Sequence, residues 1–306
     1  MELIKCKVTT ENHVILEGKY LKNKSDTCII FVPGLAGAYD GLAKTVARFC
    51  GDNKYSFVWA RTQSCFLDTT LDKITTLDKI TTLDKTIKIK AGACYDNFNT
   101  TIHELNAWYN YVKTQGYKNI VFVGHCYGCN KIVYFLNNKN IKNVKSCIFL
   151  APTDFGNIFT DERHAELLEE AIANVKNKQK DKILSKKIYG FFIMSSSAFL
   201  RLGYNPVLNN IPYKSSNGNF SMLKNINCPL YIIIGSSDKG LGKECSLENA
   251  HALMKRITNN CQHGEYLIIP GARHSFKDDY DKVYNALFET FKAMEIAEER
   301  NDGICY

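Results

Sequence analysis

A cysteine between two glycines is the residue of this chain best placed to do chemistry. Cys126 stands in the middle of Gly-His-Cys-Tyr-Gly at 124–128, after the apolar run 119–123 and before a helix-like segment. A strand, a tight turn and a helix are the setting in which this pattern presents a nucleophile. A thiol there lies at the positive end of a helix, which favours the thiolate. The pattern therefore predicts a nucleophilic sulfur, the alternative being a buried cysteine that glycines flank by chance.

A thiolate nucleophile is paired with a proton acceptor, and His274 is the histidine best placed for that role. It follows the strand-like run 266–269 and a turn at 270–273, and a helix-like segment begins a few residues later. Because the carboxyl ends of parallel strands meet at one edge of a sheet, we expect this loop beside the turn that carries Cys126. The histidines compared with it lie in a predicted hairpin, helix or insertion: His13, His103, His164 and His251.

A carboxylate is expected to orient the imidazole, and two aspartates follow strand-like runs. Asp238 follows the run 230–234, and Asp154 follows the run 146–150. Both positions predict a carboxylate at the carboxyl end of a strand. The spacing alone leaves both candidates open.

Two backbone N–H groups are needed to stabilise the oxyanion of an acyl-transfer reaction. One is expected from Tyr127, directly after the nucleophile. The other is expected from Leu35, in the glycine-rich loop 33–37 that follows the buried strand-like run 27–32. This loop has neither the dinucleotide nor the P-loop spacing, and we predict no cofactor and no metal.

The elements that must position these residues alternate between strand and helix almost throughout. Continuous apolar runs predict strands, and segments with helical periodicity separate them. The alternation predicts an α/β fold with a doubly wound, mainly parallel sheet flanked by helices. The predicted strands are 27–32, 56–60, 120–123, 146–150, 230–234 and 266–269, and the predicted helices are 40–50, 100–115, 130–136, 247–257 and 279–298.

Two segments interrupt the alternation. Thr-Thr-Leu-Asp-Lys-Ile repeats through 69–86, and we interpret this segment as a loop insertion on the surface, the alternatives being a flap over the site or an interaction hook. Residues 155–227 are too long for a plain connection and predict an inserted helical cap that opens with a helix at 161–175. The remaining core comprises 1–154 and 228–306.

The motifs together carry a family resemblance. Residues 28–37, 124–128, 235–238 and 271–274 resemble the α/β-hydrolase superfamily in their order and separations over nearly the whole chain. The resemblance implies that fold, and it favours Asp238 over Asp154, because the acid of the superfamily most often lies on this later turn.

The chain departs from the common pattern of the superfamily at two positions. Cys126 replaces the usual serine, and Pro33 stands where many members have a histidine. The first departure is similar to members with a cysteine nucleophile, such as dienelactone hydrolases and the acyl-CoA thioesterase and bile-acid-CoA:amino-acid acyltransferase group.

The predicted function is acyl transfer through a thioester on Cys126. An ester, thioester or lactone would donate the acyl group, and water or an amine or thiol would accept it. The aromatic residues of the predicted cap suit an apolar or aromatic acyl group, although they would equally suit a cap core: Phe155, Phe159, Phe191, Phe192, Phe199, Tyr204 and Tyr213.

Two other functions compete with this one. A hydrolase fold without its serine could serve as a non-catalytic receptor or interaction protein. Cys126 and Cys129 also form a C-x-x-C pattern at a helix start, where a thiol redox pair would lie. Oxidation of this pair would silence the nucleophile, so redox regulation of Cys126 is a further hypothesis.

Composition and charge exclude several classes of protein. The chain has 306 residues and a formal net charge of +8, but its lysines are spread along the sequence, which argues against nucleic-acid binding. No apolar run approaches the ~20 residues needed to span a bilayer. The N-terminus lacks a signal-peptide pattern, and the 12 cysteines are scattered. We therefore expect reduced thiols and a cytoplasmic location.

Overall fold

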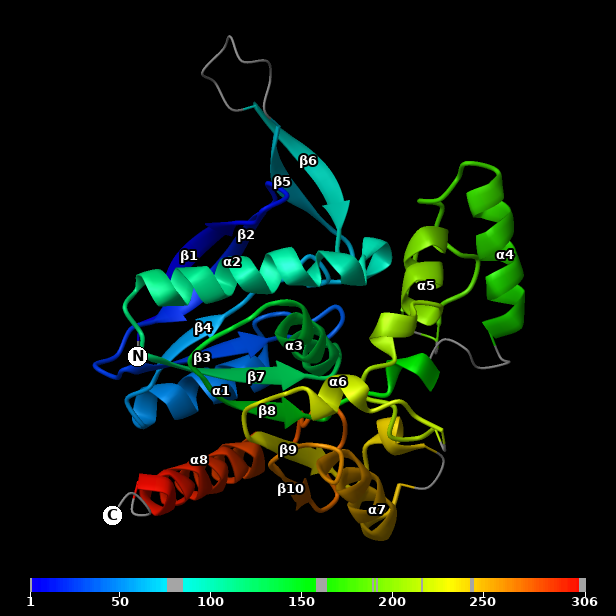
Figure 1. The fold of residues 1–306 in the computed structure, drawn as a ribbon. Coiled ribbons are helices and arrows are strands. Elements are labelled where there is room, and N and C mark those ends of the chain that lie inside the picture. The colour runs from blue at the N-terminus through cyan, green and yellow to red at the C-terminus, as the bar shows by residue number, and fades with distance from the viewer. Residues whose placement is uncertain are drawn as a thin grey trace.

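An eight-stranded sheet lies at the centre of the molecule (Figure 1). The computed structural model describes residues 2–75, 85–157, 164–188, 190, 192–215, 217–242 and 245–302, the last six of them by their backbone alone. Its strands are β1 (Ile4–Thr9), β2 (Ile15–Leu21), β3 (Thr27–Val32), β4 (Ser56–Trp59), β7 (Asn119–His125), β8 (Val144–Leu150), β9 (Leu230–Gly235) and β10 (Gly264–Ile269).

The strands of this sheet are mainly parallel, as predicted. Their spatial order is β1-β2-β4-β3-β7-β8-β9-β10. The pairs from β4 through β3, β7, β8 and β9 to β10 are parallel, and only the hairpin β1–β2 and the pair β2–β4 are antiparallel. Strands β3, β4 and β9 are buried at every residue, because helices cover both faces of the sheet.

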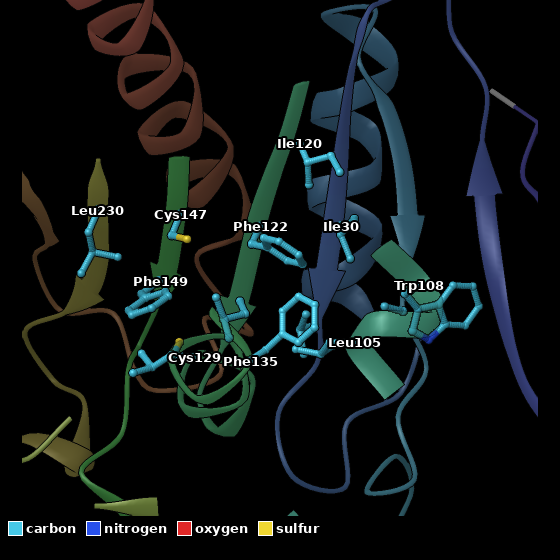
Figure 2. Close-up of a cluster of buried hydrophobic side chains, with 14 of the residues drawn as sticks. Ile30, Leu105, Trp108, Ile120, Phe122, Cys129, Phe135, Cys147, Phe149 and Leu230 are labelled. Atoms are coloured by element: carbon cyan, nitrogen blue, oxygen red, sulfur yellow. The ribbon is translucent and has the colours of Figure 1, made fainter. Parts of the chain in front are cut away.

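Helices cover the two faces of the sheet in separate layers. The helices are α1 (Gly41–Asp52), α2 (Thr101–Thr114), α3 (Tyr127–Asn138), α7 (Leu247–Thr258) and α8 (Tyr280–Asp302). Helices α2, α3 and α7 share one buried cluster with the sheet, and α1 and α8 share another. Figure 2 shows part of the first cluster, with Phe135 of α3 beside Phe122 of β7, and with Leu105 and Trp108 of α2 on the far side of Ile30.

The described ends of the hexapeptide repeat, which we expected to be a surface loop insertion, form strands. Strand β5 (Thr69–Thr75) pairs antiparallel with β6 (Lys85–Ala91) in a ribbon that projects from the sheet (Figure 1). β-Branched threonine and isoleucine favour strands. A period of six is also a multiple of two, so each repeat unit returns its residues to the same face of a strand. Residues 76–84, at the centre of the repeat, lie outside the described part of the chain.

The segment 155–227 joins β8 to β9. Most of its described residues lie beyond the carboxyl ends of the parallel strands, and the chain then returns past α6 to the amino end of β9 (Figure 1). Its α-helices are α4 (Ala165–Lys176), α5 (Ser196–Gly203) and α6 (Ser221–Lys224). Helix α4 begins at Ala165, and the first residues of the predicted helix 161–175, together with Phe159 and Phe191, lie outside the described residues. We refer to this segment as the insertion.

Much of the insertion packs on the core as a third buried cluster. Phe155 and Phe199 lie in this cluster with Leu35 and Tyr127 of the core. Short 3-10 helices complete the fold: η1 (Ala93–Tyr95), η2 (Phe98–Thr100), η3 (Phe155–Asn157), η5 (Pro206–Leu208) and η6 (Lys239–Leu241). None of the helices in the described ranges is both long enough and apolar enough to cross a bilayer.

Candidate active site

Cys126 lies on a sharp turn between β7 and α3. Its backbone has φ 52° and ψ −119°, a conformation that costs on the order of 1–3 kcal/mol in a non-glycine residue. The turn is tight because the backbone passes close to β3: a Cβ atom on Gly128 would lie 2.1 Å from the Val32 carbonyl oxygen. The strained turn leaves the cysteine partly exposed, while most of α3 is buried.

His274 and Asp238 meet beside this turn, as the predicted positions at the carboxyl ends of β10 and β9 require. The Nδ1 atom of His274 lies 2.8 Å from Oδ2 of Asp238, whose side chain is 1% exposed. The other carboxylate oxygen, Oδ1, accepts a hydrogen bond of 2.7 Å from the Gly240 N–H. The aspartate is thus fixed on both oxygens, and it orients the imidazole so that Nε2 is left for Cys126.

The Cys126 thiol and the His274 imidazole form a coupled pair. Burial by itself would raise the pKa of the thiol, but the charge of His274 and its hydrogen bond outweigh burial and hold the pKa below its ordinary value. Burial would likewise lower the pKa of His274, but Cys126 and Asp238 raise it well above its ordinary value. Opposite charges in contact favour each other. The contact therefore favours the thiolate form of Cys126 and the imidazolium form of His274.

Thr153 is a second polar contact of the sulfur, and it was not predicted from the sequence. Its hydroxyl donates a hydrogen bond to Cys126 Sγ at a donor–acceptor distance of 3.4 Å, and this bond further lowers the pKa of the thiol. Thr153 follows β8 and directly precedes Asp154, so its position at the carboxyl end of a strand was the available signal.

Both predicted oxyanion donors lie next to the nucleophile. The Tyr127 N–H lies close enough to the Cys126 sulfur to help to lower the pKa of its thiol. In the opposite loop, a Cβ atom on Gly34 would lie 3.1 Å from Cys126 Cβ. Within the described ranges the N–H of Leu35 finds no hydrogen-bond acceptor, whereas the next one, of Ala36, donates to the Ser64 carbonyl. The Leu35 N–H is therefore available to an oxyanion.

The structure separates the alternative acid from the imidazole. Asp154 is fully buried, and its Oδ2 accepts a hydrogen bond of 2.9 Å from the Lys214 N–H. Of the two aspartates, Asp238 is the one that contacts His274.

His125, which the sequence analysis did not consider, supports the loop that carries His274. Its ring centroid lies 5.3 Å from that of His274, and its Nε2 lies 3.0 Å from the His274 carbonyl oxygen. Burial, reinforced by the charge of His274, lowers the pKa of His125 to about 4. The ring is therefore neutral near pH 7, and its Nε2–H donates to the carbonyl.

Cys129, the second cysteine of the C-x-x-C pattern, is in a different environment. Its side chain is fully buried, and its thiol donates to the Gly124 carbonyl at 3.3 Å. Burial raises the pKa of Cys129 well above its ordinary value. These surroundings disfavour the thiolate that disulfide exchange requires. The disulfide with Cys126 stays a prediction.

A buried ionic network supports the turn from behind. The Tyr127 hydroxyl donates to Asp96 Oδ2 at 2.6 Å. Lys131 Nζ lies 3.0 Å from Glu104 Oε2, with both side chains 0% exposed, and 5.1 Å from the centroid of the Tyr127 ring. Burial opposes the charge of Lys131, but Glu104 and Asp96 outweigh it and raise its pKa. The network therefore holds a charged lysine beneath the nucleophile turn.

Removal of the Thr153 hydroxyl is expected to make Cys126 less acidic. In Thr153→Val the thiolate loses a donor, so its pKa rises, and we expect the midpoint of the alkylation rate against pH to move upward by about one unit. The measurement is the rate of iodoacetamide labelling of the Cys126 peptide across pH. Thr153→Ser keeps a hydroxyl and serves as the control. An unchanged midpoint in the valine variant would show that the hydrogen bond has no influence on the sulfur.

Comparisons with known proteins identify the fold and the family. The fold is similar to that of the α/β hydrolase GrgF from Penicillium sp. sh18, with a TM-score of 0.66 and 14% identity over 96% of this chain and 99% of that one. Est1E from Butyrivibrio proteoclasticus, solved with ferulic acid bound, has a TM-score of 0.61 and 13% identity over 95% and 99% of the two chains. The Pyrococcus furiosus esterase Pf2001 has a TM-score of 0.57 and 16% identity over 96% and 91%.

The structural similarity establishes the α/β-hydrolase fold, as the sequence predicted. A search of curated proteins finds no match. A family model described as "Protein of unknown function (DUF1749)" matches residues 92–294. Because that match covers more than half of the chain, this protein belongs to the DUF1749 family.

Proposed function

We propose that this protein is an acyl-transfer enzyme with Cys126 as its nucleophile, His274 as its acid and base, and Asp238 as the group that orients His274. The observation that carries the proposal is the position of His274, which contacts the Asp238 carboxylate at 2.8 Å and pairs with the Cys126 sulfur. A nucleophile, a base and a carboxylate in such a relay are the arrangement used for covalent acyl transfer.

The reaction begins when the Cys126 thiolate attacks the carbonyl carbon of the substrate. The carbonyl oxygen gains negative charge, and the N–H groups of Tyr127 and Leu35 stabilise it. His274 donates its Nε2 proton to the leaving group, and the acyl group remains on Cys126 as a thioester. His274, now neutral, takes a proton from the acceptor, which attacks the thioester and releases the acyl group.

Water, an amine or a thiol could act as the acceptor. Thioesters are more open to amine attack, relative to water, than oxygen esters are, so the sulfur makes transfer as plausible as hydrolysis. Esters with good leaving groups, thioesters and lactones suit this site best, because a poor leaving group would depart more slowly than the cysteine thiolate.

The surroundings of Cys126 favour an apolar acyl group. Cys126 packs against the third buried cluster, which combines Leu35 and Tyr127 of the core with Phe155 and Phe199 of the insertion. Transfer of an acyl chain from water to such surroundings is favourable, by roughly 0.8 kcal/mol for each buried methylene. The esterases that share the fold also support a small ester as substrate.

The proposal is tested by measuring whether turnover depends on an unmodified Cys126 sulfur. A panel of p-nitrophenyl esters, acyl-CoA thioesters and lactones is assayed while iodoacetamide is added in increments. We expect at least one substrate to be turned over, and its rate to fall in proportion to the alkylated fraction of Cys126. The Cys245→Ser variant lacks an exposed thiol that would also react and serves as the control. The proposal fails if no substrate is turned over, or if turnover survives complete alkylation of Cys126.

A further inference from the structure

A second pair of cysteines lies at the opposite end of the sheet from Cys126. The sulfur atoms of Cys147 and Cys228 are 3.7 Å apart. Cys147 is the central residue of β8, and Cys228 lies two residues before β9 begins. Figure 2 shows Cys147 in the buried cluster beside Leu230, the first residue of β9. The two thiols are therefore in contact across neighbouring parallel strands.

The two cysteines differ in their access to solvent. Cys147 is 0% exposed, whereas Cys228 is 8% exposed and lines a surface cavity of about 440 Å³. The other residues that line the cavity include six asparagines: Asn137, Asn138, Asn140, Asn143, Asn225 and Asn227. A small polar reagent can thus approach Cys228 from this cavity, with Cys147 lying behind it.

The contact between the thiols makes Cys228 the more acidic of the two. The two thiols are within hydrogen-bonding distance, and this contact lowers the pKa of Cys228 and raises that of Cys147. A third thiol, Cys261, lies nearby but is bound differently, because it donates to the Ile257 carbonyl at 3.4 Å. Burial raises the pKa of Cys261 to about 12. The accessible cysteine of the pair is thus also its best nucleophile.

We infer that Cys147 and Cys228 form a thiol-oxidation site, which a small hydroperoxide entering the asparagine-lined cavity converts to a disulfide. The Cys228 sulfur attacks the distal peroxide oxygen, the O–O bond breaks, and Cys228 becomes a sulfenic acid while water or an alcohol leaves. The Cys147 sulfur then attacks the Cys228 sulfur, the S–O bond breaks, and the Cys147 proton leaves with the hydroxide as water. The two thiols lose two electrons, and the hydroperoxide gains them.

The disulfide would enclose the whole insertion. The two cysteines are 81 positions apart, and residues 155–227 lie between them in the chain. The bond would therefore tie the strand that enters the insertion to the strand that leaves it. The disulfide would lie within the core and would not involve the Cys126 sulfur of the proposed active site. The inference therefore does not depend on the proposed function.

Peptide mapping of the full-length chain tests the inference. The protein is treated with hydrogen peroxide, its remaining thiols are blocked with iodoacetamide, and it is digested without reduction. We expect a cross-linked peptide that joins Cys147 to Cys228 and has lost two hydrogens. Limited proteolysis within the insertion adds a second readout: the two fragments should stay joined under non-reducing conditions and separate after reduction.

Variants separate this pairing from the alternatives. In Cys147→Ala the first step proceeds without the second, so dimedone should label Cys228 as a sulfenic acid. Cys261→Ser removes the neighbouring thiol and should form the cross-link as the natural chain does, within twofold in rate. The inference is wrong if the natural chain gives no Cys147–Cys228 cross-link, or if Cys228 pairs with Cys261 instead. The result in the natural chain decides the matter even if the alanine variant does not fold.

Discussion

Replacement of Cys126 with alanine will abolish acyl turnover, with an expected loss in kcat/KM on the order of 10⁴-fold or more. The variant removes the sulfur that forms the covalent intermediate and leaves the imidazole and the carboxylate in place. Steady-state kinetics on the best ester or thioester substrate measures the loss. Cys261→Ala, which removes a half-buried cysteine whose thiol bonds to the Ile257 carbonyl, is the matched control and should behave like the natural chain.

Variants of His274 and Asp238 are expected to lose as much activity as Cys126→Ala or less. His274→Ala is expected to lose as much activity as Cys126→Ala, and the double variant should lose no more than either, because residues that act as a unit are not additive. Asp238→Asn should cost less, because it misorients the imidazole but leaves it present. Turnover close to that of the natural chain in Cys126→Ala would contradict the mechanism.

Lys131→Met is expected to destabilise the protein by about 3–5 kcal/mol, because it breaks a buried ion pair and leaves charged partners without compensation. Lys131 and Glu104 are both 0% exposed at 3.0 Å, and a second buried carboxyl group, that of Asp96, lies nearby with its pKa raised by burial. Unfolding in urea, followed by circular dichroism, measures the change. Methionine fills similar space without the charge.

A surface pair provides the control for this prediction. Lys88 and Asp72 form an ion pair of 2.7 Å, but their side chains are 66% and 40% exposed. Lys88→Met should change stability by less than about 1 kcal/mol. The double variant Lys131→Met with Glu104→Gln should recover part of the loss, because the glutamine removes the charge that the single variant leaves unpaired at position 104. Equal effects of Lys131→Met and Lys88→Met would show that the buried network contributes no more than a surface pair.

The sequence was sufficient to predict the fold class and the mainly parallel character of the sheet. A strand buried on both faces must be apolar at nearly every position, and β3 and β9 are. Such runs stand out from helices whose apolar residues recur every three or four positions. The positions of Cys126, His274 and Asp238 at the ends of strands followed from the same reasoning, because parallel strands bring their carboxyl ends to one edge.

The contacts that refine the site were less accessible from the sequence. Thr153 and His125 act through geometry between segments far apart in the chain, which no local pattern encodes. The sequence does contain a weak indication of the ionic network, because Glu104 lies on the apolar face of α2 with Leu105 and Trp108. A charged residue on such a face implies a buried partner.

The repeat shows a different limit of sequence reasoning. Its apolar residues recur every third position, which fits neither a helix nor a strand. The β-branched threonines and isoleucines of β5 and β6 favoured a strand, and pairing between the two strands settled the conformation of their residues. A single strand of this composition would not have been stable alone, so the outcome depended on a partner that the local pattern does not identify.

The measurement that tests the central claim most directly is the mass of the chain during turnover. The protein is mixed with an acyl thioester, quenched in acid while the reaction proceeds, and analysed by mass spectrometry intact and after digestion. The account predicts that the mass increases by one acyl group, carried by the peptide that contains Cys126, and that Cys126→Ala shows no such increase. Turnover without an acyl group on Cys126, or with the acyl group on another residue, would contradict it.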